Sequence, residues 1–190
     1  FSEMPSNSVW TDTAEGCCRT PENQPSSITV MKPFTEESAL VWATRKCSLQ
    51  ECYPQEIIRK LREGGLPESR IAPIVARLIE EGYLNEGRYA KAFIHDKMAY
   101  DHWGKLKIRA ALSMKGIPDA AINRAFAETD DADYRLMMKE VLASKFRSLQ
   151  FDPDNETETY KATQKLLRFA ATRGFEADKV FSIIHELKAD

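Results

Sequence analysis

The sequence predicts an all-α protein built from repeated helical hairpins, and three observations support this fold class. Beyond residue 34, apolar residues recur at helical spacing, and the alternation of apolar and polar residues that marks a strand is absent. Glycines and prolines also punctuate the chain at regular intervals. The glycines that suit left-handed helix ends are Gly64, Gly65, Gly82, Gly116 and Gly174.

Residues 1–34 precede the helical pattern and differ from it in composition. They hold four of the nine prolines, many Ser, Thr and Asn residues, and two basic against four acidic side chains. Such a segment buries too little apolar surface to offset the entropy lost on ordering. We expect a disordered or loosely attached tail over residues 1–34.

Nine helices are expected after this segment, each bounded by residues that favour a helix start or stop. Pro54, Pro67 and Pro118 suit the first helical turn, where the missing N–H of proline costs no hydrogen bond. Asn85 and Asp130 suit N-cap positions. The expected helices span residues 35–47, 54–64, 67–81, 86–99, 103–115, 118–128, 131–149, 157–173 and 176–188.

The helical pattern repeats three times about a glycine. When Gly65, Gly116 and Gly174 are aligned, apolar residues occupy five common offsets: eight and four residues before the glycine, and one, six and ten after it. The aligned residues are Ile57, Leu61, Leu66, Ile71 and Val75 in the first copy, Ile108, Leu112, Ile117, Ile122 and Phe126 in the second, and Leu166, Ala170, Phe175, Val180 and Ile184 in the third. The offsets before and after the glycine form two stripes, so each copy is a two-helix hairpin preceded by one further helix.

A three-helix unit of about 50 residues buries little core by itself. We therefore expect neighbouring units to stack into an elongated, curved helical array of the right-handed type. The predicted units span residues 35–85, 86–130 and 131–190.

Composition excludes several classes of protein. The net charge is −2, with 43% hydrophobic and 29% charged residues, and no apolar run approaches the ~18 residues that cross a bilayer. No signal peptide is visible, so a cytoplasmic protein is expected. The spacing of the cysteines fits no zinc site, which favours reduced thiols, and no histidine lies in an HExxH motif. These residues are Cys17, Cys18, Cys47 and Cys52, with His95, His102 and His185.

No set of residues points to catalysis, so no enzyme, metal or cofactor is predicted. The carboxylates of Asp130, Asp131 and Asp133 could bind a cation, but they also stand at an expected helix start. Acidic residues there complement the helix dipole, and capping is the favoured interpretation.

The feature of the sequence that points to a binding function is the positive charge in the middle of the chain. Residues 88–124 contain eight basic and three acidic side chains, in a chain that is acidic overall. The candidate contact residues are Arg88, Lys91, Lys97, Trp103, Lys105, Lys107, Arg109 and Lys115. Basic residues beside an aromatic ring can contact phosphates and stack on bases. The competing interpretation is a solvated surface whose lysine stems cover apolar neighbours, with Trp103 in the core.

Helical spacing orients these side chains differently. Arg88, Lys91 and His95 share one exposed helix face, whereas Lys105 and Arg109 share an edge of the next helix. Lys107 and Lys115 point elsewhere, so the basic residues do not form a single row. Gly104 suits a close approach of two backbones.

The residues Ala76 to Ala90, ARLIEEGYLNEGRYA, resemble the junction between the first two units of the RecX family. So does WGKLKIR at 103–109 with KGI at 115–117, and the resemblance covers about residues 35–188. RecX proteins are bacterial regulators of the recombinase RecA, built from three tandem three-helix units. One departure is Asn85, where the family commonly has aspartate.

The resemblance implies a monomeric, non-enzymatic regulator without a cofactor. It would lodge along the groove of the RecA filament on single-stranded DNA and inhibit RecA ATPase, recombinase and co-protease activity. Recombination, DNA repair and the SOS response would thereby be modulated.

The alternative is an autonomous nucleic-acid-binding helical module, motivated by the basic middle of the chain. The segment after the fourth helix, Met98 to His102, is less basic than the corresponding segment usually is in RecX proteins. The pI of about 6.0 is also low for a strong nucleic-acid binder. Direct DNA contact is therefore expected to be weak.

Overall fold

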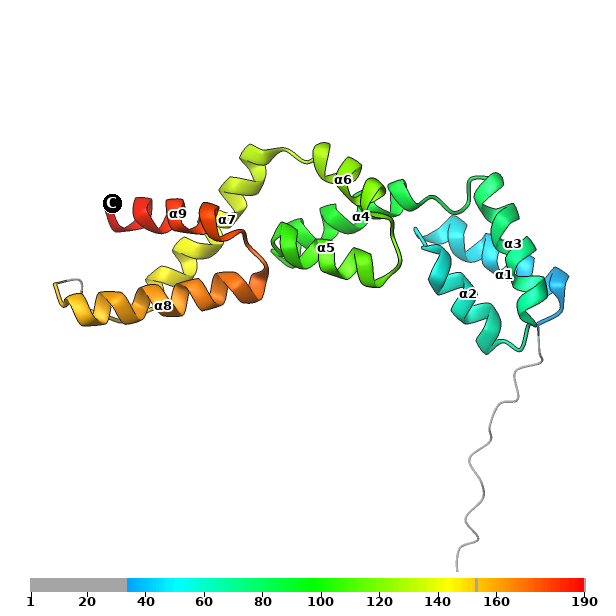
Figure 1. Cartoon of the computed structure of the whole chain (residues 1–190), viewed down its shortest axis with the longest axis horizontal. Helices are drawn as coiled ribbons and strands as arrows, with labels where there is room; N and C mark the ends of the chain where they lie inside the picture. Colours follow the sequence, from blue (N-terminus) through cyan, green and yellow to red (C-terminus); the bar gives the residue numbers. More distant parts are fainter. Residues whose placement is uncertain (1–33, 153, 190) are drawn as a thin grey trace, which may run out of the picture. The chain divides into compact units, whose positions relative to one another are not determined.

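The structure is a computed structural model that describes residues 34–152 and 154–189, and this part of the chain contains nine α-helices and no strand (Figure 1). The helices are α1 (Glu36–Leu49), α2 (Pro54–Glu63), α3 (Glu68–Glu80), α4 (Glu86–Ala99), α5 (Lys105–Met114), α6 (Asp119–Ala127), α7 (Asp131–Arg147), α8 (Glu156–Arg173) and α9 (Ala177–Ala189). The all-α prediction is confirmed, and each helix lies within two residues of its expected bounds. The expected tail, apart from Phe34, lies outside the described residues, as do Cys17 and Cys18.

Most of the helix starts are those that the sequence predicts. Asn85 and Asp130 are N-caps whose side chains accept hydrogen bonds from the backbone of Arg88 (2.9 Å) and Ala132 (2.7 Å). Pro54 is the first residue of α2, as expected. Pro67 and Pro118 were expected at the first helical position but are N-caps, so α3 and α6 begin one residue later than predicted. The acidic residues after Asp130 occupy the first turn of α7, so the capping interpretation of this cluster is confirmed.

The start of α5 differs from the expectation. The predicted helix begins at Trp103, whereas α5 begins at Lys105 with Gly104 as N-cap. The reason is the turn that ends α4: His102 adopts a left-handed backbone (φ 51°), and the Trp103 N–H donates back to the Lys97 carbonyl at 2.9 Å. Trp103 therefore belongs to the closing turn of α4.

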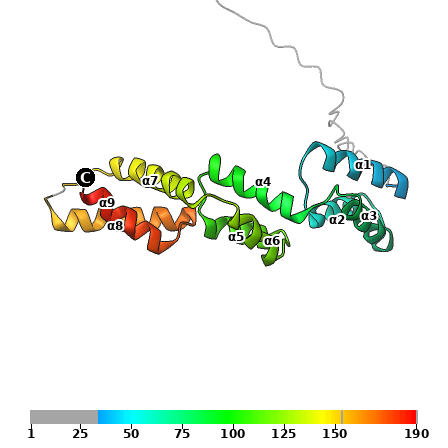
Figure 2. The same ribbon diagram turned by 90° about the horizontal axis from the view of Figure 1, so that it is seen from above.

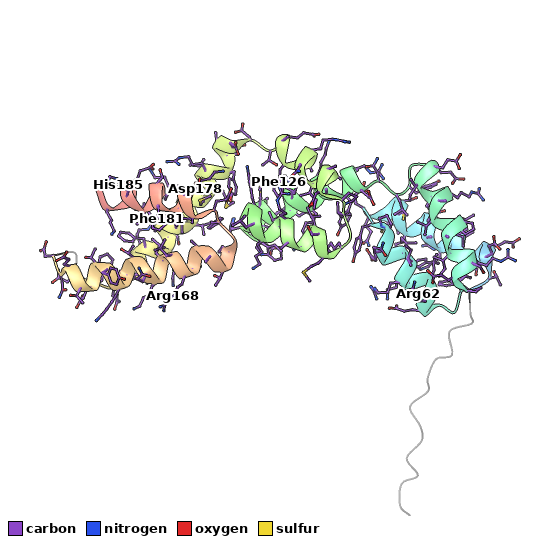
Figure 3. All side chains as sticks on the ribbon, in the orientation of Figure 1. Arg62, Phe126, Arg168, Asp178, Phe181 and His185 are labelled. Carbon is purple, nitrogen blue, oxygen red and sulfur yellow. The ribbon has the colours of Figure 1, made fainter. Side chains whose placement is uncertain are left out.

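The helices pack in three consecutive triplets, α1–α3, α4–α6 and α7–α9 (Figures 1 and 2). In each triplet the third helix packs against the first and the second. Each triplet also has its own cluster of buried apolar side chains, and Phe126 of α6 (Figure 3) belongs to the middle one. The prediction of three three-helix units is confirmed, while the exact boundaries at 85/86 and 130/131 remain predictions.

The repeat about the three glycines is confirmed residue by residue. All fifteen aligned apolar side chains are buried, with at most 9% of their surface exposed. Gly65, Gly116 and Gly174 all have positive φ, between 78° and 83°. The residue after each glycine donates its N–H to the carbonyl five positions back, at 3.1 Å in all three copies. Each turn is thus closed by the same left-handed glycine motif.

The N-terminus of α5 meets the turn between α8 and α9 without any side chain between the two backbones. Gly104 N–H donates to the Arg173 carbonyl (2.7 Å) and Leu106 N–H donates to the Gly174 carbonyl (3.1 Å). A Cβ on Gly104 would lie 2.1 Å from the Gly174 oxygen, so glycine is required for this contact. The close approach expected at Gly104 is therefore confirmed.

Tyr134 adds a polar connection at the same place. Its buried hydroxyl donates to the Glu176 carboxylate and accepts the backbone N–H of Lys105 at 3.2 Å. Burial, together with the hydrogen bond to Glu176, raises the pKa of Tyr134. The side chain consequently stays a neutral donor far above neutral pH.

Four buried groups give stability a dependence on alkaline pH. Burial raises the pKa of the Cys47 thiol to about 12 and raises the pKa values of Cys52, Tyr89 and Tyr134. The unfolded chain releases these protons near the ordinary values, about 8.5 for Cys and 10 for Tyr. Above about pH 9 the unfolded state then binds fewer protons than the folded state. The stabilisation that these groups contribute is therefore full at neutral pH and is lost as pH rises beyond about 9.

Denaturant midpoints measured at about pH 8, 9.5 and 11 check this expectation. Tyr89→Phe should flatten the decline, whereas Tyr100→Phe should not, because Tyr100 is exposed. A midpoint that stays constant to pH 11 would show that these protons are lost equally easily in both states.

None of the helices in the described ranges is long and apolar enough to cross a bilayer.

Candidate functional site

The structure separates the predicted contact residues into three groups. Arg88 and Lys91 lie on α4, and both are engaged by carboxylates. Arg88 pairs with Glu51, in the segment before α2, and also donates to the Gly82 carbonyl at 3.2 Å. Lys91 pairs with Glu128 at the end of α6, at 2.6 Å. These two residues share a helix but reach toward different neighbours, and their charges are partly compensated.

Lys105 and Arg109 form the second group, on the edge of α5 that the spacing predicts. The Lys105 ammonium lies 2.5 Å from Asp131 and 4.8 Å from the centre of the Tyr134 ring. Its hydrogen bond lowers the pKa of Asp131. The Arg109 guanidinium lies 5.4 Å from the centre of the Phe126 ring. Lys105 thus joins α5 to α7 and is already occupied by contacts within the fold.

The third group brings four of the predicted residues together with aromatic rings. Lys97 and Lys107 lie over the Trp103 ring, at 5.0 and 4.4 Å from its centre. Lys97 also lies 5.7 Å from Phe93. Lys115 lies 5.5 Å from the centre of Phe93 and 4.5 Å from that of Tyr53, the N-cap of α2.

The same chain of contacts continues onto the third triplet. Lys107 donates to the Thr172 carbonyl (3.3 Å) at the end of α8. The neighbouring Arg173 donates to the Asp101 carbonyl (2.7 Å) and lies over the Phe169 ring, which Lys145 of α7 also approaches. We call this set the cation–aromatic row. Its members are Tyr53, Phe93, Lys97, Trp103, Lys107, Lys115, Lys145, Phe169 and Arg173.

Sequence reasoning missed five members of this row: Tyr53, Phe93, Lys145, Phe169 and Arg173. Some pairs are close in the sequence: Phe93 and Lys97, and likewise Phe169 and Arg173, lie one helical turn apart. The contacts of Lys115 with Tyr53 and of Lys145 with Phe169 join residues more than 20 positions apart, so only the packing of the helices reveals them.

The row carries uncompensated positive charge. Lys97 forms an ion pair with Asp101 at 2.5 Å. Among the described residues, by contrast, no carboxylate lies within ion-pair distance of Lys107 or Lys115. Each of these ammonium groups is held over a ring face, an arrangement worth roughly 0.5–1 kcal/mol at exposed sites. The row therefore holds ammonium groups in place that have no acidic partner among the described residues.

Trp103 lies at the edge of the core, and its contact with a partner stays a prediction. Its ring packs against the middle apolar cluster and is only partly buried, while two ammonium groups lie over it. It acts as a platform that positions Lys97 and Lys107.

An open cavity of about 560 Å³ adjoins one end of the row. Tyr53, Phe93, Lys97 and Lys115 line one part of it, with Arg59 nearby. Glu51, Glu56 and Asp96 also line it, so acidic groups limit its attraction for anions. In the described ranges, no group of three or more ligand-type side chains gathers to hold a metal ion.

Comparison with known proteins gives consistent results. A family profile described as "RecX, second three-helix domain" matches residues 85–125. The chain is 34% identical over 125 residues to the "Regulatory protein RecX" of Pseudomonas putida strain GB-1, covering 66% of this chain and 75% of that protein. It is 25% identical over 167 residues to the protein of the same name from Mycolicibacterium smegmatis, covering 86% of this chain and 87% of that one.

Solved structures show the same fold. "Crystal structure of RecX from Lactobacillus salivarius" is 26% identical, with a TM-score of 0.65, and the match covers 82% of this chain and 97% of that one. "Crystal structure of regulatory protein RecX" superimposes with a TM-score of 0.69 at 22% identity, covering 82% of this chain and 73% of that one. The names agree with the regulatory role that the resemblance implies.

Proposed function

Because this chain belongs to the RecX family of regulatory proteins, we propose that it binds the RecA filament on single-stranded DNA and restrains RecA activity. Binding along the filament groove inhibits ATP hydrolysis, strand exchange and co-protease activity. The protein thereby modulates recombination, DNA repair and the SOS response in the cytoplasm. It acts as a monomer and needs no cofactor, since nucleotide and Mg²⁺ belong to RecA.

The observation that carries this proposal is the cation–aromatic row. Its cations are held over ring faces before any partner arrives, so little side-chain entropy is lost on binding. Lys107 and Lys115 have no acidic partner of their own among the described residues and are free to pair with carboxylates or phosphates across an interface. Charges of this kind act mainly through the rate of encounter and through repulsion when their sign is reversed.

The distribution of the row over the three triplets also supports the proposal. The row draws residues from α4, α5, α7 and α8 and from the N-cap of α2, so it includes residues of all three triplets. A filament offers the same surface on successive subunits, and several separate contacts to it combine into higher affinity than any one of them has alone.

The first functional prediction tests the row directly. Replacing Lys107 and Lys115 together by glutamate should strongly reduce the inhibition of RecA ATP hydrolysis on single-stranded DNA. The denaturant midpoint should fall modestly, because three ring contacts worth roughly 0.5–1 kcal/mol each at exposed sites are lost. ATP hydrolysis is measured across a range of protein-to-RecA ratios, and added salt should weaken the unmodified protein in the same direction.

A control is available on α1 and α6, which contribute no residue to the row. Arg45 and Arg124 are exposed and belong to no ion pair among the described residues. Arg45→Glu with Arg124→Glu makes the same change of net charge outside the row and should leave inhibition intact. Full inhibition by the row variant would remove these lysines from the mechanism, and unchanged RecA hydrolysis with the unmodified protein would contradict the proposed function itself.

The second candidate is direct nucleic-acid binding, favoured by the same pairing of cations and rings. Titration of single-stranded DNA at two salt concentrations without RecA separates the two functions. An autonomous module would bind tightly, with log K falling by about 0.7 per phosphate contact for each unit of log salt. Negligible binding would leave the filament as the partner.

A further inference from the structure

A second cavity, of about 550 Å³, lies on another part of the middle triplet and is bordered by α4, the α6–α7 connection and α7. We call it the α4–α7 pocket. Its apolar lining comes mainly from Ile94, Met98, Ala125 and Met137. Met98 packs against both the middle and the third apolar clusters, so the pocket lies where these clusters adjoin. None of the residues assigned to the cation–aromatic row lines it.

Helix geometry separates this pocket from the row. Successive residues of an α-helix are turned by about 100°, so Phe93 and Lys97 lie on one side of α4, and His95 lies about 160–200° away from them. His95 and Lys91 line the α4–α7 pocket, whereas Phe93 and Lys97 belong to the row. The two surfaces therefore use opposite sides of the same helix.

The rim of the α4–α7 pocket is acidic. It includes the carboxylates of Glu128, Asp130 and Asp133 and one lysine, Lys91, which Glu128 already engages at 2.6 Å. Asp130 caps α7, but Asp133 is exposed and forms no ion pair among the described residues. The rim thus keeps a negative excess beside apolar side chains, the opposite of the charge on the row.

We propose that the α4–α7 pocket docks a protein segment that carries apolar side chains flanked by lysine or arginine. The apolar lining favours a buried side chain, and the carboxylates attract the flanking cations. Methionine side chains are flexible and polarizable, so Met98 and Met137 can adapt to the shape of the inserted group. A nucleic acid is disfavoured, because its phosphates would face Asp130 and Asp133.

The occupant is thus a basic, apolar protein segment, distinct in chemistry from the acidic partner of the row. This inference does not depend on the proposed function, because it concerns residues that the row does not use. A regulator with two oppositely charged surfaces could hold two partners, or two parts of one partner, at the same time.

The test uses the full chain and a short fluorescein-labelled peptide with a central leucine–phenylalanine pair flanked by arginines. Binding is followed by anisotropy and located by NMR of methionine methyl groups. We expect the Met98 and Met137 methyl signals to shift on titration and the Met114 signal to stay in place, because Met114 is exposed on α5 and lies outside the pocket.

Two variants on the rim, each with a control outside the pocket, test the charge of the rim and access to the apolar interior. Asp133→Lys should weaken binding at least about tenfold, because like charges then face each other. Glu140→Lys, two turns further along the same side of α7 and outside the pocket, should leave affinity within about twofold. Ala99→Trp, from an exposed alanine on the rim, should block entry, whereas Ala110→Trp on the exposed side of α5 should not.

Three outcomes would overturn the proposal. The first is the absence of binding. The second is equal binding of a peptide whose central pair is replaced by glycines, since that would leave only nonspecific attraction to the rim. The third is a shift of the Met98 and Met137 methyl signals by oligothymidylate and not by the peptide, which would assign the pocket to nucleic acid.

Discussion

Replacing Leu112 by alanine is expected to lower the free energy of unfolding by roughly 2–5 kcal/mol, the range for large-to-small changes in a packed core. Leu112 is fully buried on α5 and belongs to the middle apolar cluster. Removal of its side chain leaves a cavity that its neighbours, held by two other helices, cannot fill completely. Leu61 occupies the equivalent position in the first triplet and is also fully buried, so Leu61→Ala should have a comparable cost.

Leu106 provides the matched control on the same helix. It is 54% exposed, so Leu106→Ala makes the same chemical change without opening a cavity and should alter stability by about 0.5 kcal/mol or less. Urea denaturation followed by circular dichroism measures both variants. Similar midpoints for Leu106→Ala and Leu112→Ala would contradict the assignment of the aligned stripe to the core.

Gly104→Ala is the second change with a large expected effect. A Cβ at this position would lie 2.1 Å from the Gly174 oxygen, 2.2 Å from its carbonyl carbon and 2.4 Å from the Phe175 nitrogen. All three are backbone atoms, so no side chain can rotate away, and the start of α5 must separate from the α8–α9 turn. Overpacking of this kind costs about 1–3 kcal/mol, and occasionally more. The two backbone hydrogen bonds across this contact would lengthen or break as well.

The backbone conformation of Gly104 shows why the expected loss of stability in Gly104→Ala would be steric. Its φ is −79°, which alanine adopts freely, so the expected loss is steric and owes nothing to backbone strain. Gly87, in the first turn of α4, is the control: a Cβ there would meet only the Asn85 side-chain oxygen, at 3.4 Å. Gly87→Ala should be neutral or stabilising, since alanine favours helix more than glycine does.

Hydrogen exchange at Gly104 and Leu106 gives a local measurement beside the denaturant midpoint. Both amides should exchange faster in Gly104→Ala than in the unmodified protein, because their acceptors lie across the contact. Unchanged exchange together with an unchanged midpoint would show that the two backbones are not closely packed.

The candidate site was predictable in part. The sequence identified the basic middle of the chain and the aromatic residue within it, and the structure places Lys97, Trp103, Lys107 and Lys115 together. It did not separate these from Lys105, which binds Asp131 on another helix. Charge counts along the chain show which residues are basic, but the distance to an acidic partner decides which of them remain available.

The sequence by itself determined the helices, their caps and the repeat, because these depend on interactions between residues close together in the chain. Asn85 caps α4 from three residues away, and the glycine turns close over five residues. Even there, the left-handed backbone of His102 moved the start of α5 past Trp103. Only the tertiary structure brought Lys107 to the Thr172 carbonyl, Arg173 to the Asp101 carbonyl, and Gly104 against Gly174. These contacts join residues more than 60 positions apart, and no local pattern of spacing encodes which helices will meet.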